Sequence, residues 1–122
     1  MGYDAGTLRR LVARGHVVFV DVSAAWCLIC KANELTVLDR DPVAQRLREP
    51  GVVAMRADWT RPDPAITAYL QSFGRYGVPL DVVYGQGAPG GIALPELLTA
   101  DTVMGAFRRA AAGPARHREA TK

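Results

Sequence analysis

The stretch that decides the fold is residues 16–31, HVVFVDVSAAWCLICK. Its first part, residues 16–22, is a nearly unbroken run of β-branched and aromatic residues, which predicts a strand buried on both faces, as in the centre of an α/β sheet. Residues 23–26 form a short turn, and Cys27 then opens a helical pattern that continues to about Asp39. This order predicts that the two cysteines, Cys27 and Cys30, lie at the start of a helix that follows a buried strand.

Outward from this stretch, the apolar spacing predicts alternating helices and strands. The expected helices cover residues 4–14, 27–39, 41–49, 63–74 and 100–111, with Asp41 and Thr99 as N-caps of the third and the last. The expected strands cover residues 16–22, 52–58, 80–84 and 92–94, and the glycine-rich loop 85–91 predicts a hairpin between the last two. This order predicts an α/β fold, a mixed central sheet of about four strands with helices on both faces.

Length and composition exclude several classes of protein. The 122 residues, 49% of them hydrophobic, predict one compact domain over residues 1–112 and a flexible polar tail over residues 113–122. No run of about 18 or more apolar residues is present, and the N-terminus lacks the pattern of a signal peptide. If the protein works outside the cytoplasm, we expect the chain to be an excised piece or to have lost its leader.

The net charge of +3 does not indicate nucleic-acid binding. Residues 113–122 contain Arg116, Arg118 and Lys122 against Glu119, so the rest of the chain has 12 basic and 11 acidic residues, a net charge of +1. This part has no cluster of basic residues interleaved with aromatic ones, which is the usual mark of a nucleic-acid surface. We therefore expect no nucleic-acid partner.

Cys27 and Cys30 have the C-x-x-C spacing of a redox pair. At a helix N-terminus the free backbone N–H groups and the helix dipole favour the thiolate of Cys27. Cys30 lies one turn further in, close enough to form a disulfide with Cys27. The pair can then cycle, because Cys27 attacks a partner disulfide and Cys30 resolves the mixed disulfide.

Three other interpretations of the pair stay open: an inert buried pair, a static structural disulfide, and half of a metal site. A closed zinc site needs two further ligands, and the only histidines are His16 and His117, of which His117 lies in the polar tail. Zinc is therefore disfavoured. A Cu(I) site made of the two thiolates is the alternative function, as a copper-binding or copper-handling module.

Two acidic residues are further candidates. Asp21 lies inside the most apolar strand, where a carboxylate is costly unless it has a role. Glu34 shares one helical face with the two cysteines. We expect Asp21 and Glu34 to accept and return the proton of Cys30 during exchange. The alternative is that Asp21 caps a backbone group and that Glu34 is a solvated helix residue.

The dipeptide Val78-Pro79 directly precedes a predicted strand, where an interior proline would remove a ladder hydrogen bond. A cis peptide there would turn the chain and leave a backbone edge free, which could pair with an extended partner segment. The residues alone favour the simpler alternative, an ordinary trans proline at the start of a strand.

The residues from Val18 to Lys31, followed by Asn33-Glu34, resemble the active-site segment of the thioredoxin superfamily. More narrowly, they resemble the C-terminal periplasmic domain of the membrane thiol:disulfide interchange protein DsbD and its relatives. The similarity extends from about Leu8 to Arg109. It includes three further segments, Asp41-Pro42-Val43, Ala57-Asp58-Trp59-Thr60 and Gly77-Val78-Pro79.

The resemblance implies a thioredoxin-like fold and a protein-disulfide reductase. Cys27 would be the exposed nucleophile and Cys30 the buried resolving thiol, while Asp21 and Glu34 would be the acids near the pair. Pro79 would be in the cis form. The residues that would contact the substrate are Trp26, Val78 and Pro79. The domain would need no dissociable cofactor and no metal, because the cysteine pair itself carries two electrons.

The resemblance also implies partners and a location. In that family the domain takes electrons from a transmembrane partner domain and passes them to a periplasmic partner that keeps other proteins' thiols reduced, as cytochrome c biogenesis requires. We therefore expect a periplasmic, monomeric domain of an inner-membrane protein that acts on protein thiols and disulfides. The dipeptide Leu28-Ile29 differs from the Gly-Pro of cytoplasmic thioredoxins. Because this dipeptide helps to set the reduction potential, the direction of transfer stays open.

Overall fold

The computed structural model describes residues 1–113. The elements are α1 (Ala5–Ala13), β1 (Val17–Ser23), α2 (Leu28–Asn33), the π-helical turn η1 (Glu34–Leu38), α3 (Val43–Leu47), β2 (Val52–Asp58), α4 (Pro64–Ser72), β3 (Leu80–Gly85), β4 (Ala88–Ala93) and α5 (Ala100–Ala111). Within residues 1–113 no helix has the length and apolar character needed to cross a membrane. The tail predicted for residues 113–122 lies, apart from Gly113, outside the described residues.

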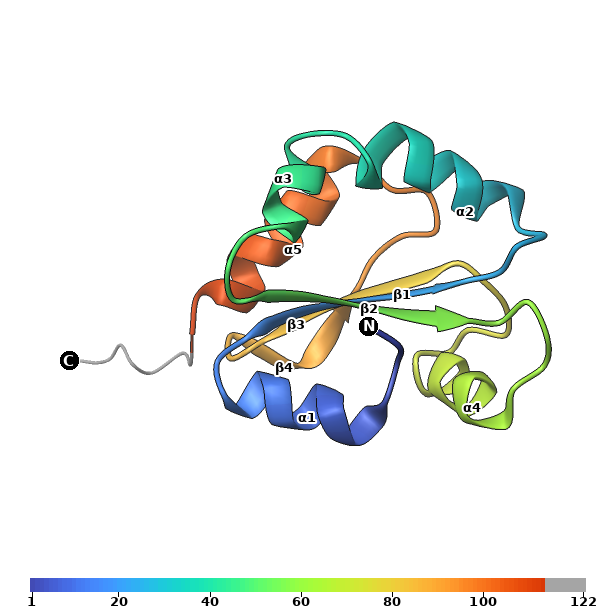
Figure 1. The fold of residues 1–122 in the computed structure, drawn as a ribbon, viewed down its shortest axis with the longest axis horizontal. Helices are drawn as coiled ribbons and strands as arrows, with labels where there is room; N and C mark the ends of the chain where they lie inside the picture. The colour runs from blue at the N-terminus through green and yellow to red at the C-terminus, as the bar shows by residue number, and fades with distance from the viewer. Residues whose placement is uncertain (114–122) are drawn as a thin grey trace.

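Four strands form one sheet in the order β2-β1-β3-β4. β1 and β2 are parallel, while β3 is antiparallel to both β1 and β4. Helices α2, α3 and α5 cover one face of the sheet, and α1 and α4 cover the other (Figure 1). The predicted fold class, a mixed four-stranded sheet with helices on both faces, is therefore confirmed.

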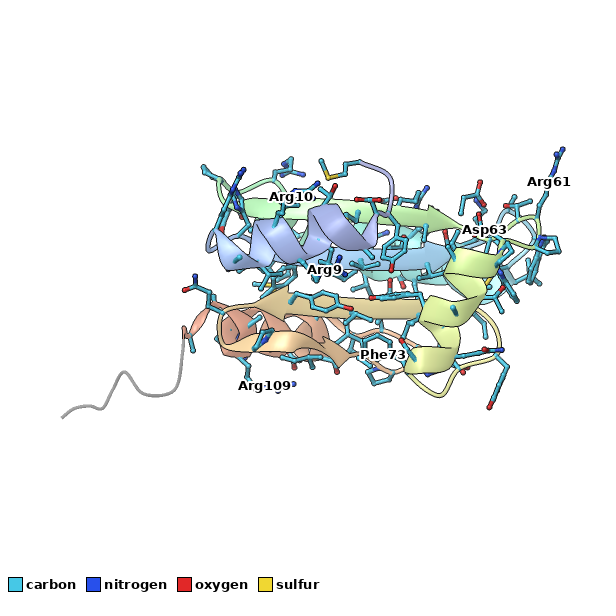
Figure 2. The ribbon with its side chains drawn as sticks, turned by 90° about the horizontal axis from the view of Figure 1, so that it is seen from below. Arg9, Arg10, Arg61, Asp63, Phe73 and Arg109 are labelled. Atoms are coloured by element: carbon cyan, nitrogen blue, oxygen red, sulfur yellow. A yellow bond between two sulfur atoms is a disulfide. The ribbon has the colours of Figure 1, made fainter. Side chains whose placement is uncertain are left out.

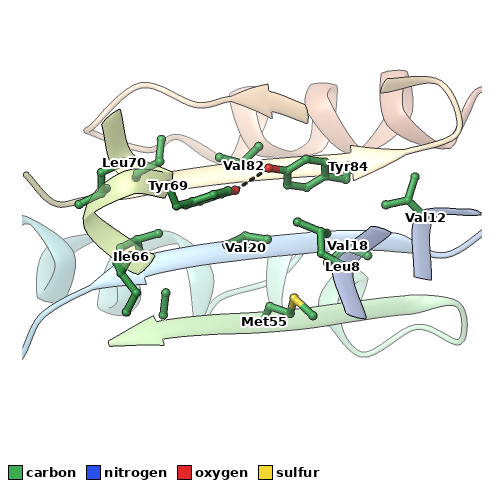
Figure 3. Packing of buried hydrophobic residues seen from close by; sticks show 13 residues of the cluster. Leu8, Val12, Val18, Val20, Met55, Ile66, Tyr69, Leu70, Val82 and Tyr84 are labelled. Carbon is green, nitrogen blue, oxygen red and sulfur yellow. Dashed lines mark hydrogen bonds between the residues drawn. The ribbon is translucent and has the colours of Figure 1, made fainter. Parts of the chain in front are cut away.

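Each face of the sheet has its own apolar core, because side chains alternate along a strand. Val20 and Val22 of β1 belong to the cluster on the side of α1 and α4, which lie over opposite ends of that face (Figure 2). In this cluster the hydroxyl oxygens of Tyr69 and Tyr84 lie 2.6 Å apart and form a hydrogen bond (Figure 3). Phe19 belongs to the other cluster, which includes side chains of α5 and η1.

Side-chain caps explain most of the helix starts. Asp4, Asp63 and Thr99 accept backbone N–H groups in the first turns of α1, α4 and α5, and the cap predicted at Thr99 is confirmed. The cap predicted at Asp41 is wrong. Pro42 holds the cap position of α3, the Asp41–Pro42 peptide is cis, and no side chain caps this helix. Asp41 therefore lies one residue too early to serve as the cap.

Candidate functional site

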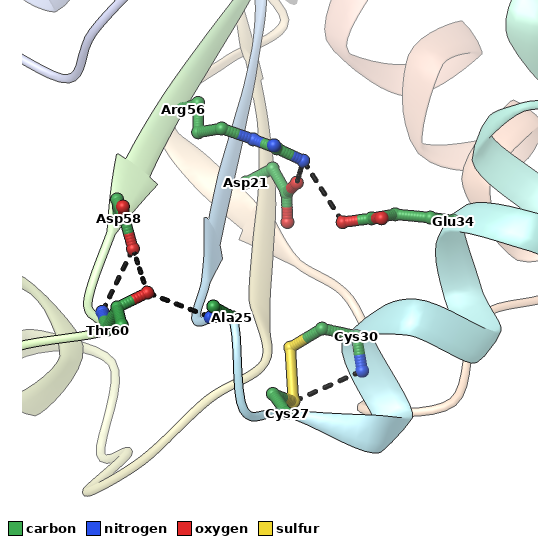
Figure 4. Close-up of polar contacts among 8 residues, drawn as sticks. All are labelled: Asp21, Ala25, Cys27, Cys30, Glu34, Arg56, Asp58 and Thr60. Carbon is green, nitrogen blue, oxygen red and sulfur yellow. Dashed lines mark hydrogen bonds and ion pairs between the residues drawn. A yellow bond between two sulfur atoms is a disulfide. The ribbon is translucent and has the colours of Figure 1, made fainter.

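The cysteine pair lies at the start of α2, as the sequence predicts (Figure 4). The two residues form a disulfide, and their Cα atoms are 5.3 Å apart. Cys27 is the N-cap residue, and its Sγ accepts the backbone N–H of Cys30 at 3.1 Å. The same N–H group would stabilise a thiolate on Cys27 in the reduced form, because a donor to a negatively charged sulfur favours the charge.

Both cysteines are buried, which corrects the expectation that Cys27 is exposed. Cys27 is 6% exposed and Cys30 is 4% exposed, and Val78 packs against them. The neighbours Trp26 and Leu28 are instead 59% and 84% exposed. In the disulfide form these neighbouring side chains, and not the sulfur of Cys27, make up the surface of the site.

The loop before α2 is held by the chain that follows β2. The Thr60 hydroxyl oxygen accepts the backbone N–H of Ala25 at 2.8 Å, and the Thr60 carbonyl accepts the indole N–H of Trp26 at 3.1 Å. Asp58 in turn accepts the backbone N–H of Thr60 at 2.9 Å (Figure 4). Hydrogen bonds from the Thr60 hydroxyl and backbone lower the pKa of Asp58. This network fixes the orientation of Trp26 before any partner binds.

The Val78–Pro79 peptide is cis. This overturns the trans proline that the residues alone favour and agrees with the resemblance. Pro79 is buried, and its carbonyl accepts Nη1 of Arg75 at 3.1 Å, while Nη2 of the same guanidinium donates to the Leu94 carbonyl at 2.8 Å. Arg75, which the sequence analysis missed, therefore ties the proline segment to the residue that follows β4.

Asp21 and Glu34 are joined by Arg56, a second residue that the sequence analysis missed. Arg56 of β2 lies opposite Asp21 of β1 in the parallel register. Its Nη2 contacts Oδ2 of Asp21 at 3.3 Å and Oε2 of Glu34 at 3.1 Å (Figure 4). Burial lowers the pKa of Arg56, but the two carboxylates outweigh burial and raise it. The Asp21 and Glu34 side chains are 13% and 22% exposed, so neither is a fully solvated group.

The helix predicted over residues 27–39 changes its geometry where Glu34 begins. α2 ends at Asn33, and the N–H of Asp39 then donates to the Glu34 carbonyl at 2.8 Å, five residues back, as in a π turn. The buried Asn33 amide donates to the Glu96 carbonyl at 2.8 Å and accepts the N–H of Leu98 at 3.1 Å. Asn33 thereby fixes the end of α2 against the segment that precedes α5, and Glu34 is held facing Arg56.

A cavity of about 510 Å³ opens beside these charged residues. Asp21, Glu34 and Arg56 line its polar part, and Phe19 and Leu38 are among its apolar lining. The carboxyl groups of Asp21 and Glu34 therefore face this cavity. Trp26 is not among the residues that line this cavity.

The metal-ligating side chains are few in the part of the chain that the structure describes. Within residues 1–113 no group of three or more His, Cys, Asp or Glu side chains is placed to hold a metal ion. His16 directly precedes β1, and His117 lies outside the described residues. Cys27 and Cys30, the pair considered for Cu(I), are joined to each other.

The chain is similar to known proteins in sequence and in fold. A family model described as Thioredoxin-like matches residues 3–85, and no curated protein matches the chain. The oxidised C-terminal domain of Neisseria meningitidis DsbD is 20% identical with a TM-score of 0.69, over 90% of this chain and 98% of that one. Its reduced form is 22% identical with a TM-score of 0.62, over 90% of this chain and 99% of that one. A thioredoxin from Thermus thermophilus is 19% identical with a TM-score of 0.62, over 98% of this chain and 96% of that one.

Proposed function

This chain belongs to the thioredoxin-like family, and we propose that it is a thiol–disulfide oxidoreductase that passes two electrons through Cys27 and Cys30. The observation that carries the proposal is the disulfide between these residues at the start of α2. As a static cross-link this bond would contribute little stability, because it closes a very small loop. Its position at a helix N-terminus, with a donor to Cys27 Sγ, fits a reactive pair instead.

The proposed reaction proceeds through a mixed disulfide. The Cys27 thiolate attacks one sulfur of a protein disulfide, and the other sulfur leaves and takes a proton. Cys30 then loses its proton to Asp21, and its thiolate attacks Cys27 Sγ. The bond between Cys27 and the substrate breaks, the substrate is released with both sulfurs reduced, and the Cys27–Cys30 disulfide forms. In this scheme the cysteine pair carries the electrons, with no dissociable cofactor and no metal.

The substrate binds, in this proposal, across the surface that surrounds the buried sulfurs. An extended segment of the substrate protein lies along Val78-Pro79, which is beside the cysteine pair, and adds its backbone to that edge. Trp26 offers an exposed aromatic face whose indole is already held by the Thr60 carbonyl. Because its orientation is fixed in advance, Trp26 loses little freedom when the substrate binds.

The finer role that we propose is that of a periplasmic reductant. The domain, monomeric and part of an inner-membrane protein, would take electrons from a transmembrane donor domain. It would pass them to a periplasmic acceptor domain and so to protein disulfides, including those of cytochrome c biogenesis. The support is the likeness in fold to the DsbD C-terminal domain in both redox forms, over almost the whole length of that domain.

Reduction of insulin disulfides with a chemical thiol as electron source tests the proposed activity. The wild type should reduce insulin, Cys27→Ser should abolish the reaction, and Cys30→Ser should accumulate a mixed disulfide with the substrate. The two serine variants are matched controls for each other, since they differ only in which sulfur is removed. Full activity of Cys27→Ser would contradict the proposal, and tight stoichiometric Cu(I) binding without insulin reduction would favour the copper-handling alternative.

A further inference from the structure

Asp81 is a buried carboxyl that the proposed reaction does not use. It lies in β3, a strand whose residues are all buried, and it is itself only 2% exposed. Neighbours on either side, Leu80 and Val82, belong to the apolar cluster toward α1 and α4. Because side chains alternate along a strand, Asp81 is on the opposite face, the one that α2 and α5 cover.

Asp81 stands directly opposite Asp21. The two are Cα partners in the antiparallel pairing of β1 with β3, so their side chains lie on the same face of the sheet as neighbours. Two carboxylates side by side repel each other strongly in a buried site. Asp21 already shares the single guanidinium of Arg56 with Glu34. Two carboxyls therefore contact one cation, and the third, Asp81, neighbours only Asp21.

No group in residues 1–113 neutralises Asp81 in the way that Arg56 neutralises Asp21. Oδ1 of Asp81 is buried and has no hydrogen-bond partner among these residues. The charge of Arg75 lowers the pKa of Asp81, but its Nη1 and Nη2 donate to the carbonyls of Pro79 and Leu94. An ionised carboxylate with an unpartnered oxygen is costly in such a place, and a proton on it removes the cost.

The electrostatic surroundings of Asp81 also favour its protonated form. Burial raises the pKa of Asp81 well above its usual range, and the hydrogen bond and charge of the Asp21 carboxyl raise it further. Arg75 and Arg56 lower it by less. Of these charged groups, Asp21 belongs to β1, Arg75 follows α4 and Arg56 belongs to β2. Glu34 of η1 is linked to them through Arg56. Asp81 is thus the carboxyl best placed to keep a proton.

We propose that Asp81 is protonated at neutral pH and donates a hydrogen bond to Asp21, so that a pair of carboxyls, and not a single acid, serves the cysteine couple. This inference rests on the proposed function. Asp81 is a positioning residue in this scheme, because it acts through Asp21. Its O–H group keeps Asp21 in the carboxylate form before the exchange step. Only this ionised form of Asp21 can accept a proton.

Proton transfer to Asp21 accompanies the exchange step in this scheme. The Cys30 thiol gives its proton to the Asp21 carboxylate, so the carboxyl pair passes from one bound proton to two. The Cys30 thiolate forms its bond to Cys27 Sγ, the bond from Cys27 to the substrate sulfur breaks, and the substrate leaves as a thiolate that takes a proton from water. The proton on Asp21 then returns to solvent through the cavity that Asp21 lines, while the proton of Asp81 stays in place.

The direct test is a pH titration of the side-chain carboxyl ¹³C signals of the wild-type domain by NMR, with infrared spectra in parallel. We expect Asp81 to keep its proton at pH 7 and to give the infrared C=O band of a protonated carboxylic acid. Asp81→Asn should lose that band, whereas the matched control Asp101→Asn, at an exposed position on α5, should keep it. An Asp81 signal that titrates in the ordinary acidic range of an aspartate overturns the proposal, and this measurement needs no variant to fold.

The pH profile of mixed-disulfide resolution separates a proton-sharing role from a structural one. Asp81→Leu removes the donor to Asp21, so the midpoint of the profile should move to higher pH, and a one-unit move means a tenfold slower reaction on the acid side. Asp81→Asn, whose amide N–H still donates, should move the midpoint less. Unmoved midpoints in both variants would overturn the role. If the wild type fails to reduce insulin while Asp81 proves protonated, the carboxyl pair stands and the proposed function fails.

Discussion

Each face of the sheet has one pair of buried polar side chains, and the two pairs differ in whether their polar atoms have partners. Toward α1 and α4, the hydroxyl groups of Tyr69 and Tyr84 satisfy each other at 2.6 Å within an apolar cluster. Toward α2 and α5, Asp21 and Asp81 face each other, and an oxygen of Asp81 has no partner among residues 1–113. The tyrosine pair follows the rule that buried polar groups are paired, and the aspartate pair breaks it. Under the proposed function, the tyrosine pair serves stability and the aspartate pair serves chemistry.

The largest expected effect comes from Asp21, on the face toward α2 and α5. Asp21→Asn removes the group that we propose as the acceptor of the Cys30 proton, so the rate of mixed-disulfide resolution should fall by about a hundredfold or more. The melting temperature should change little in comparison. Rapid-quench kinetics with a peptide disulfide measures the rate, and Asp101→Asn is the control. A variant that is less stable but reacts at the wild-type rate would show that Asp21 serves stability and not the exchange reaction.

Leu70 provides the counterpart on the face toward α1 and α4. Its side chain is fully buried in the cluster with Val20 and Val82. Leu70→Ala should therefore lower the free energy of unfolding by about 2–5 kcal/mol, through lost burial and the cavity that remains. Denaturant unfolding measures this loss. The reduction potential of the folded variant should equal that of the wild type, and a shifted potential would contradict a separation of the two faces.

The tyrosine pair gives a smaller effect on the same face. Tyr69→Phe leaves the buried hydroxyl of Tyr84 without its partner, which should cost about 1–3 kcal/mol of unfolding free energy. The double variant Tyr69→Phe/Tyr84→Phe removes both hydroxyls and should recover part of that loss. A double-mutant cycle by denaturant unfolding checks this. Strictly additive losses would show that the two hydroxyls do not stabilise each other.

The pH dependence of stability tests the unpaired carboxyl. Because the pKa of Asp81 is raised in the folded state, the folded chain binds more protons than the unfolded chain between the unfolded and the folded pKa. The free energy of unfolding therefore falls as pH rises through this window, by about 1.4 kcal/mol for each pH unit. Asp81→Asn removes this pH-dependent loss of stability. The free energy of unfolding of the variant relative to the wild type should therefore increase with pH above about 4.

Thermal unfolding at a series of pH values measures that difference, with Asp101→Asn as the control. The control should follow the wild type across the whole range, since Asp101 is exposed. A constant offset between Asp81→Asn and the wild type at all pH values would contradict a raised pKa at Asp81. A gain that grows with pH would show that the wild type retains Asp81 at a cost to its stability.

Arg56 should give the smallest effect on stability. Its side chain is 59% exposed, and exposed ion pairs contribute about 0.2–1 kcal/mol. Arg56→Gln should lower the free energy of unfolding by about that amount, and added salt should reduce the difference. Arg48→Gln is the matched control, because Arg48 contacts Asp41 only at 3.9 Å and both side chains are exposed. Equal losses in the two variants would show that Arg56 does not hold the carboxyl cluster together.

Much of the fold follows from local patterns in the sequence. The β-branched run of residues 16–22 predicts β1, and the cap at Thr99 predicts the start of α5, and the structure confirms both elements. The position of Cys27 and Cys30 follows from the same logic, since a buried strand must be followed by a turn before a helix can begin. These features depend on neighbours in the chain, and local chemistry is sufficient to predict them.

The features that the sequence analysis missed depend on pairing between distant segments. Arg56 lies in a strand with alternating exposure, and only the register with β1 brings it to Asp21. Arg75 acts on carbonyl groups, which leave no mark in a sequence. Asp81 could have been found, because a carboxyl within the apolar run of residues 80–84 is the same signal that identified Asp21. The burial of Cys27 depends on Val78, which reaches it only in the folded chain.

The reduction potential of the Cys27–Cys30 couple, measured by equilibration with glutathione, tests the central claim most directly. A pair that works as a reductant should have a potential near that of thioredoxin, about −270 mV. A value near about −120 mV would mean that the pair is an oxidant, and a value well below about −300 mV would mean that the bond is a structural disulfide. Either of these two results would contradict the proposed function.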